Sequence, residues 1–345
     1  MNTTFEAMKK TLLATLLSFT FASQAEAALT AYYSLDNLSS GIQNQGTDGA
    51  ASNLSALDAA ATPTVVSGGI IGGALSFDGN DLLRSLTAGN AGDDLAAYPF
   101  TMSIWARNVT IDSSRDAVFS VSNRTVADRY YTLGVDGSSG TRAEPELIRR
   151  NTAFTEMNAT NANVSGATWS NIVTVFGTGG GQIYVDGKLV NSVAGGQTFS
   201  DTVDTISIGG FLRNNATAPT DPFRGEADDA GLFDTALLNS DIALINGLGR
   251  TGGIGLDQFD EAQALLALST GSTALIGGYT WERVAGLAGT TGDFGGTTVG
   301  GNAFIVTDAL GNGIQVTAIP EPSTVLLVAS GIGLLGWRQL RKRHH

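Results

Sequence analysis

The sequence contains no cysteine, and its only two histidines, His344 and His345, are the last two residues. The absence of cysteine excludes disulfides, thiol catalysis and thiolate metal sites. The absence of histidine from the rest of the chain excludes serine–histidine–aspartate triads and histidine-ligated zinc there. Carboxylates are therefore the groups left for acid–base chemistry or metal binding.

Charged residues are scarce as well, at 15% of 345 residues, whereas glycine occurs 45 times. This composition favours many short strands and tight turns over long surface helices. Residues 28–337 contain 13 basic and 30 acidic residues, a formal charge of about −17. Such an acidic body repels phosphate backbones and anionic lipid, so nucleic acid is not an expected partner. The simplest role of the charge is solubility outside the cell.

The N-terminal segment reads as a targeting signal. Residues 1–27 combine two lysines, an apolar stretch and an A-x-A cleavage site at Ala25 and Ala27, the pattern of a secretory signal peptide. Translation can start at Met1 or at Met8, because the leader is complete from either. We therefore expect export through the general secretion machinery.

The C-terminal segment carries a second signal. Pro320, Glu321 and Pro322 precede an apolar segment at 324–337 and a basic end. This order resembles the PEP-CTERM sorting signal of Gram-negative bacteria, here over 320–345. The resemblance implies an exosortase as processing partner, anchoring in the inner membrane by a C-terminal transmembrane helix, and then a place at the cell surface or in the extracellular matrix. The basic end agrees with the positive-inside rule, and so short an apolar run suits a transient anchor.

Between the two ends, polar and apolar residues alternate in many short segments, which is typical of strands. The segments Gln182–Val185 and Lys188–Val193 are joined by Asp186-Gly187, a strong signal for a two-residue hairpin turn. The other predicted strands are Leu29–Leu35, Phe100–Arg107, Ala117–Val121, Tyr130–Val135, Glu146–Arg150, Trp169–Phe176, Thr205–Gly209 and Ala227–Phe233. Strands at this spacing predict an antiparallel sandwich.

A short helix is expected over Leu238–Leu248, at the end of the sandwich region, because its apolar residues recur at helical spacing. The region that follows, 250–319, is predicted as a helix with a small β appendix. Its helix is expected over Asp257–Leu268, for the same reason. Three short apolar pieces beyond them predict three strands: Tyr279–Val284, Ala303–Val306 and Ile314–Val316.

Six segments resemble, in order, the landmarks of laminin-G-like, concanavalin A-like jelly-roll domains. They are GGALSFDGNDLL from Gly72, FTMSIWAR from Phe100, WSNIVTVF from Trp169, GQIYVDGKLV from Gly181, ISIGG from Ile206 and FRGEADDAGLFDTALLNSDI from Phe223. The resemblance implies an all-β fold, an antiparallel two-sheet jelly-roll sandwich, over residues 28–249.

The resemblance also implies one structural calcium ion. Members of this superfamily often hold one where the first and last strands meet, and the matching positions are Asp36, Asp78 and Asp229, with Asp228 as a rival for Asp229. Calcium prefers the carboxylate and carbonyl oxygens that such turns supply. Solvated turn acids are the alternative, because aspartate before glycine is ordinary turn chemistry.

Aromatic residues are the candidates for glycan contact. Trp105 alternates with core positions and is predicted on the concave sheet, where relatives bind glycans, with Trp169 and Tyr184 beside it. Aromatic faces suit sugar rings, but such residues more often serve packing. The acidic body predicts a preference for neutral or cationic glycans, or for anionic ones bridged by calcium.

Catalysis is not expected. Laminarinase-type glycoside hydrolases share this sandwich and carry Glu-x-Asp-x-x-Glu on one strand. The nearest run here, Glu226-Ala227-Asp228, has Gly231 where the second glutamate belongs, so the motif fails. We expect a non-catalytic cell-surface or matrix module for carbohydrate binding and adhesion. A structural biofilm-matrix protein without a specific ligand and an atypical glycoside hydrolase are the alternatives.

Overall fold

The computed structural model describes residues 27–38, 41–87, 90–91, 99–112, 114–151, 153–194, 203–250, 254–266, 268, 271–285, 302–307 and 313–317. The cleavage-site residue Ala25 and the whole sorting signal lie outside these ranges. Among the described helices none is long and apolar enough to span a membrane. The predicted transmembrane segment at 324–337 is not among the described residues.

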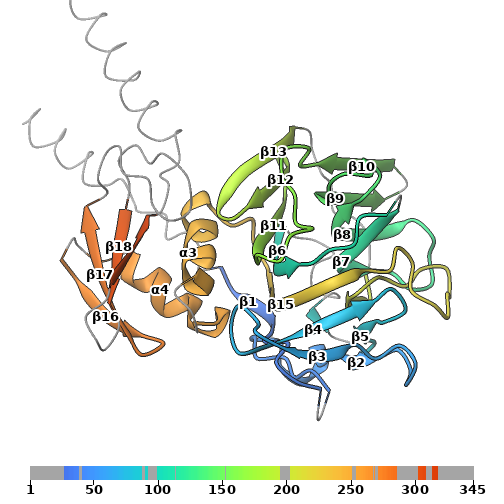
Figure 1. The fold of residues 1–345 in the computed structure, drawn as a ribbon, viewed down its shortest axis with the longest axis horizontal. Helices are drawn as coiled ribbons and strands as arrows, with labels where there is room; N and C mark the ends of the chain where they lie inside the picture. Colours follow the sequence, from blue (N-terminus) through green and yellow to red (C-terminus); the bar gives the residue numbers. More distant parts are fainter. Residues whose placement is uncertain are drawn as a thin grey trace, which may run out of the picture.

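The chain forms an antiparallel β-sandwich, which confirms the predicted all-β fold (Figure 1). The larger sheet has eight strands in the order β13-β12-β11-β6-β15-β4-β3, and β1 pairs with the second half of β15. Its strands are β1 (Leu29–Tyr33), β3 (Thr64–Ser67), β4 (Gly73–Asp78), β6 (Phe100–Arg107), β11 (Ser170–Gly177), β12 (Gly180–Val185), β13 (Lys188–Ala194) and β15 (Arg224–Phe233).

The second sheet has seven strands in the order β10-β9-β8-β7-β14-β5-β2. They are β2 (Ser55–Ala56), β5 (Leu83–Ser85), β7 (Arg115–Ser122), β8 (Arg129–Asp136), β9 (Glu144–Asn151), β10 (Ala153–Asn158) and β14 (Thr205–Ile208), and the short helix η1 (Gly49–Ser52) precedes β2. Side chains from the two inner faces meet in one core, where the ring of Phe100 lies edge-on to that of Tyr131 at 5.4 Å. Alternation along each strand places these residues inward.

The central hairpin forms where the sequence predicts it. β12 and β13 pair across Asp186 and Gly187, whose φ values are 51° and 75°. Positive φ at both turn positions matches the right-handed twist of the strands, and glycine accepts it without steric cost.

Two helices cover the outer face of the eight-stranded sheet. They are α3 (Asn239–Arg250) and α4 (Phe259–Leu266), with the short helix η3 (Leu256–Gln258) leading into α4. Ile242 and Ile245 of α3 join the same buried cluster as Val173 and Tyr184 of the sheet. A second hydrophobic core therefore lies between this outer face and the two helices.

A third sheet completes the fold beyond α4. Its four strands, in sequence order, are β16 (Thr273–Ile276), β17 (Tyr279–Ala285), β18 (Asn302–Thr307) and β19 (Gly313–Thr317). Trp281 and Ile276 pack into the helical cluster, and α3 lies between this sheet and the sandwich (Figure 1). The appendix has one strand more than predicted, because β16 is only four residues long and pairs through a Gly277-Gly278 turn.

Candidate functional site

Trp105 lies on the eight-stranded sheet, beneath the last turn of α3. Its side chain is fully buried, and a Cβ added to Gly249 would come within 2.4 Å of the indole Cζ2 atom. The guanidinium of Arg250 lies 5.1 Å from the ring centroid. This position corrects the predicted role: Trp105 is a packing contact between sheet and helix, and no polysaccharide reaches it in this conformation.

Trp169 and Tyr184 are buried on the same side of the molecule. The indole Nε1 of Trp169 donates to the carbonyl oxygen of Gly68 at 3.1 Å, and Arg107 lies 4.4 Å over its ring. Tyr184 contacts Asn239 at the start of α3 through its hydroxyl. Packing, the alternative that the sequence left open, therefore describes all three predicted aromatic residues.

Two of the acids that the sequence singles out fix a glycine-rich loop between β3 and β4. Asp36 Oδ1 accepts a hydrogen bond from the backbone N–H of Gly73 at 2.7 Å. Asp228 Oδ2 accepts the backbone N–H groups of Ile70 at 2.8 Å and Ile71 at 3.1 Å. Carboxylates that accept several backbone N–H groups are common loop anchors, and here they hold two distant strands together.

Asp229 occupies a bulge in β15, where the register to β6 shifts. Its φ of 48° is left-handed, and its side chain is buried. Burial raises the pKa of Asp229 to about 7, and a hydrogen bond from Tyr32 opposes the shift. Burial, then the neighbouring Asp229, raises the pKa of Asp228 to about 9. Asp229 Oδ1 is buried and has no hydrogen-bond partner within the described part of the chain.

Asp78 does not join these acids. Asp78 is the last residue of β4, whereas Gly73, which donates its N–H to Asp36, is the first. Five residue steps along the strand therefore separate Asp78 from Gly73 by about 16 Å. The exposed Asp78 carboxylate accepts the N–H of Asn80 within its own turn at 2.8 Å. Asp78 thus lies at the other end of β4 from the loop that Asp36 and Asp228 anchor.

The acids around Asp36 meet only part of what a calcium site needs. No group of three or more carboxylate, histidine or cysteine side chains within the described ranges has the geometry to hold a metal. The buried, unpartnered oxygen of Asp229 is nevertheless an acceptor that a cation could satisfy. Calcium bound by Asp36 and Asp229, or by Asp228 as the rival of Asp229, stays a prediction, with Asp78 apart from them.

The outer face of the seven-stranded sheet is different in kind, because no helix among the described residues packs on it. Its central side chains are polar and buried: Ser120, Ser122, Thr132, Thr205 and Ser207. The segment 209–223, between β14 and β15, folds onto this face. The ring of Phe211 lies 4.4 Å from that of Tyr130, and the N–H of Ala117 donates to the carbonyl oxygen of Asp221 at 2.7 Å.

A charged cluster that the sequence did not reveal lies on this face. The fully buried carboxyl of Glu146 on β9 is 3.1 Å from the Nε of Arg115 on β7. Arg115 also pairs with Glu156 on β10, whose negative charge contributes to the raised pKa of Glu146. Burial raises the pKa of Glu146 to about 9, although the charge of Arg115 lowers it. Three strands contribute one residue each, so no one-strand motif could indicate the cluster.

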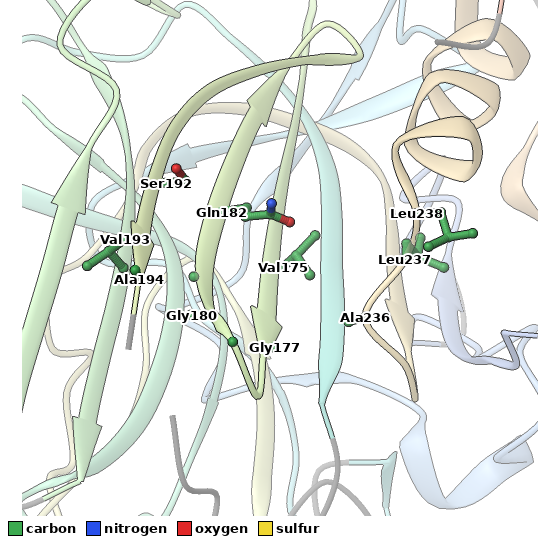
Figure 2. A pocket seen from close by; sticks show the side chains of 12 residues that line it. Val175, Gly177, Gly180, Gln182, Ser192, Val193, Ala194, Ala236, Leu237 and Leu238 are labelled. Atoms are coloured by element: carbon green, nitrogen blue, oxygen red, sulfur yellow. The ribbon is translucent and has the colours of Figure 1, made fainter. Parts of the chain in front are cut away.

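A pocket of about 400 Å³ lies at the end of the β11–β12 hairpin. Figure 2 shows Val175 and Gln182 on the strands, opposite Leu237 and Leu238 on the segment that leads into α3. Its lining is mainly glycine, alanine and aliphatic side chains, with Gln182 and Ser192 as the polar ones. Without charged or aromatic side chains, this lining offers little to orient a sugar.

Comparisons with known proteins agree with this architecture. Residues 84–243 match the concanavalin A-like lectin/glucanases superfamily, and residues 318–343 match the PEP-CTERM protein-sorting motif. The first match covers most of the sandwich, and the chain carries a sorting motif that indicates export and sorting to the cell surface of a Gram-negative bacterium. No curated protein sequence matches the chain.

Several solved structures are distantly similar. Domain 4 of AbnA, a GH43 extracellular arabinanase from Geobacillus stearothermophilus, in complex with arabinotriose, is 18% identical, with a TM-score of 0.49, over 63% of this chain and 98% of that one. The CBM40 of the Ruminococcus gnavus IT-sialidase, bound to α2,3-sialyllactose, is 17% identical, with a TM-score of 0.40, over 53% and 95% of the two chains.

Proposed function

We propose that this exported, surface-sorted protein binds polysaccharide through its sandwich and does not cleave it. The match to a lectin and glucanase superfamily and the sorting motif support this proposal. The motif requires a sorting protease of the exosortase class as a partner. Because many copies would stand on one surface, binding that is weak at each site still gives firm retention through avidity.

The difference between the outer faces of the two sheets supports one location for the proposed site. The outer face of the eight-stranded sheet is occupied by α3 and α4, with Trp105 and Tyr184 fully buried there. On the outer face of the seven-stranded sheet, the loop segment 209–223 packs against the strands. Charged side chains such as Arg124 and Arg150 are partly exposed to solvent there. Within the described part of the chain no helix occupies this second face, which supports it as the place where a polymer binds.

The carboxyl pair on that face favours binding over hydrolysis. Glycosidases place their two carboxyl groups about 5 Å apart or more, because a sugar ring or water must fit between them. Arg115 lies between Glu146 and Glu156 and forms an ion pair with each of them. This arrangement suits a structural ion cluster.

The test is retention on insoluble polysaccharides with different backbones, together with an assay for released reducing sugar. We expect retention on at least one polymer without sugar release. Absence of retention on every polymer would favour a structural matrix protein without a specific ligand. Sugar release that follows protein concentration would make it a hydrolase.

A further inference from the structure

The charges on the outer face of the seven-stranded sheet are separated along its strands. At one end, Arg115, Asp136 and Glu144 lie side by side in register. Glu146 and Glu156 belong to this end as well, so carboxylates dominate it. At the opposite end, the neighbours in register are Ser122, Tyr130 and Arg150.

Arginines gather at that opposite end. Arg84 extends from β5 beside Ser207, and Arg124 follows the end of β7. The loop segment 209–223 adds Arg213, whose guanidinium lies 5.7 Å from the ring centroid of Tyr130. The N–H of Asn215 donates to the carbonyl oxygen of Arg124 at 2.7 Å, which brings this segment next to the end of β7. The arginine end, as we call it, comprises Arg84, Arg124, Arg150 and Arg213.

Carboxylates neutralise the arginine end incompletely. Asp128 forms a 2.7 Å ion pair with Arg150, whereas Asp204 is 3.8 Å from the Nε of Arg124. Within the described ranges, no carboxylate lies at ion-pair distance from Arg84 or Arg213, although Asp221 acts on Arg213 from farther away. Burial and the like charge of Arg124 both lower the pKa of Arg84. A bound anion would relieve that repulsion.

We propose that the arginine end binds the carboxylate groups of an acidic polysaccharide, a proposal that rests on the proposed function. A guanidinium offers paired N–H donors that match the two oxygens of a carboxylate. The overall acidity of the chain does not prevent this, because salt screens charges beyond about 8 Å at physiological ionic strength. The local excess of arginine then decides which polymer is held, in place of the neutral or cationic glycans that the total charge predicts.

The experiment compares immobilised polygalacturonate with the same polymer after reduction of its carboxyl groups, using the exported protein. We expect binding to the carboxylated polymer alone, with an affinity that falls as salt increases. Arg84→Gln and Arg124→Gln should each weaken binding by about tenfold, since hydrogen bonds between charged groups are strong. Arg84→Lys keeps the charge but loses the paired donors, so its binding should be intermediate.

The matched control is Arg142→Gln, which removes the same charge from an exposed arginine paired with Glu144, at the acidic end of the same sheet. Its binding and melting temperature should stay unchanged. Equal binding to the intact and reduced polymers, equal losses in Arg142→Gln and Arg84→Gln, or equal affinity for dextran sulfate would overturn the carboxylate proposal. If the parent protein binds none of the polymers, neutral ones included, the proposed function itself is overturned.

Discussion

Arg250, the last residue of α3, donates through Nη2 to Asp186 Oδ1 at 2.9 Å and to the carbonyl oxygen of Trp169 at 3.0 Å. Asp186 is also the first residue of the central hairpin turn, and its Oδ1 accepts the N–H of Asn171. One guanidinium therefore joins the helix that covers the eight-stranded sheet to the tip of its central hairpin.

Removing this joint should loosen the helix without unfolding the sandwich. We expect Arg250→Ala to lower the free energy of unfolding by about 1–2 kcal/mol, a modest value because both side chains are partly exposed. Arg250→Lys should recover only part of it, since an ammonium cannot keep both bonds and the contact with Trp105. Urea denaturation measures the change. An Arg250→Ala protein as stable as the parent would contradict the role of the joint.

The packing of Trp105 against Gly249 predicts a paired result. Trp105→Ala should cost about 3–5 kcal/mol, because it leaves a large cavity beneath α3. Gly249→Ala should cost about 1–3 kcal/mol for the opposite reason, since the added methyl overlaps the indole. Leu275→Ala, at a side chain 74% exposed, is the control and should change little. Melting curves of the three variants check the order. A stable Trp105→Ala protein would show that the site is not packed as described.

The buried carboxyl of Glu146 predicts a pH dependence. Its pKa is raised to about 9 in the folded chain, against about 4.3 when unfolded. The folded state therefore binds the extra proton, and this stabilisation is complete below pH 4 and declines as the pH rises toward 9. Glu146→Gln removes the titration and keeps the shape. Between pH 5 and pH 9 the parent should lose at least about 1 kcal/mol more than Glu146→Gln in urea titrations. Parallel curves would contradict the raised pKa.

Calcium, if bound beside Asp36 and Asp228, should raise the melting temperature. A ligand that binds only the folded state adds about 2.7 kcal/mol at a hundredfold excess over its dissociation constant. Asp36→Asn should abolish the difference between melts in calcium and in chelator. Asp78→Asn is the control and should preserve that difference, because Asp78 lies at the other end of β4. Identical midpoints of the parent protein in the two conditions would exclude the site.

Processing of the two termini is testable by mass. In a host with the matching sorting protease, the mature chain should begin near Ala28 and end near Pro320 to Pro322. Intact-mass analysis of the released protein gives both ends. A released chain that still carries Trp337 to His345 would contradict the assignment of the tail.

Local signals in the sequence determined much of the fold. Alternation over Phe100–Arg107 located β6 at its observed bounds, and Asp186-Gly187 located the hairpin, because both signals depend on neighbouring residues alone. The edge strand β10 was missed, because the AFTEMN segment pairs with β9 on one side only and its alternation is weak.

The sites depended on contacts that the sequence could not show. Alternation indicates that Trp105 faces away from Phe100 and Ile104, but only the tertiary structure decides that α3 lies on that side and buries it. Likewise, Arg84 and Arg124 are forty residues apart and become neighbours only through the register of β5, β14 and β7. A sequence by itself determines which side chains share a strand face. Which layer covers that face, and which distant charges meet on it, follows from the pairing of strands far apart in the chain.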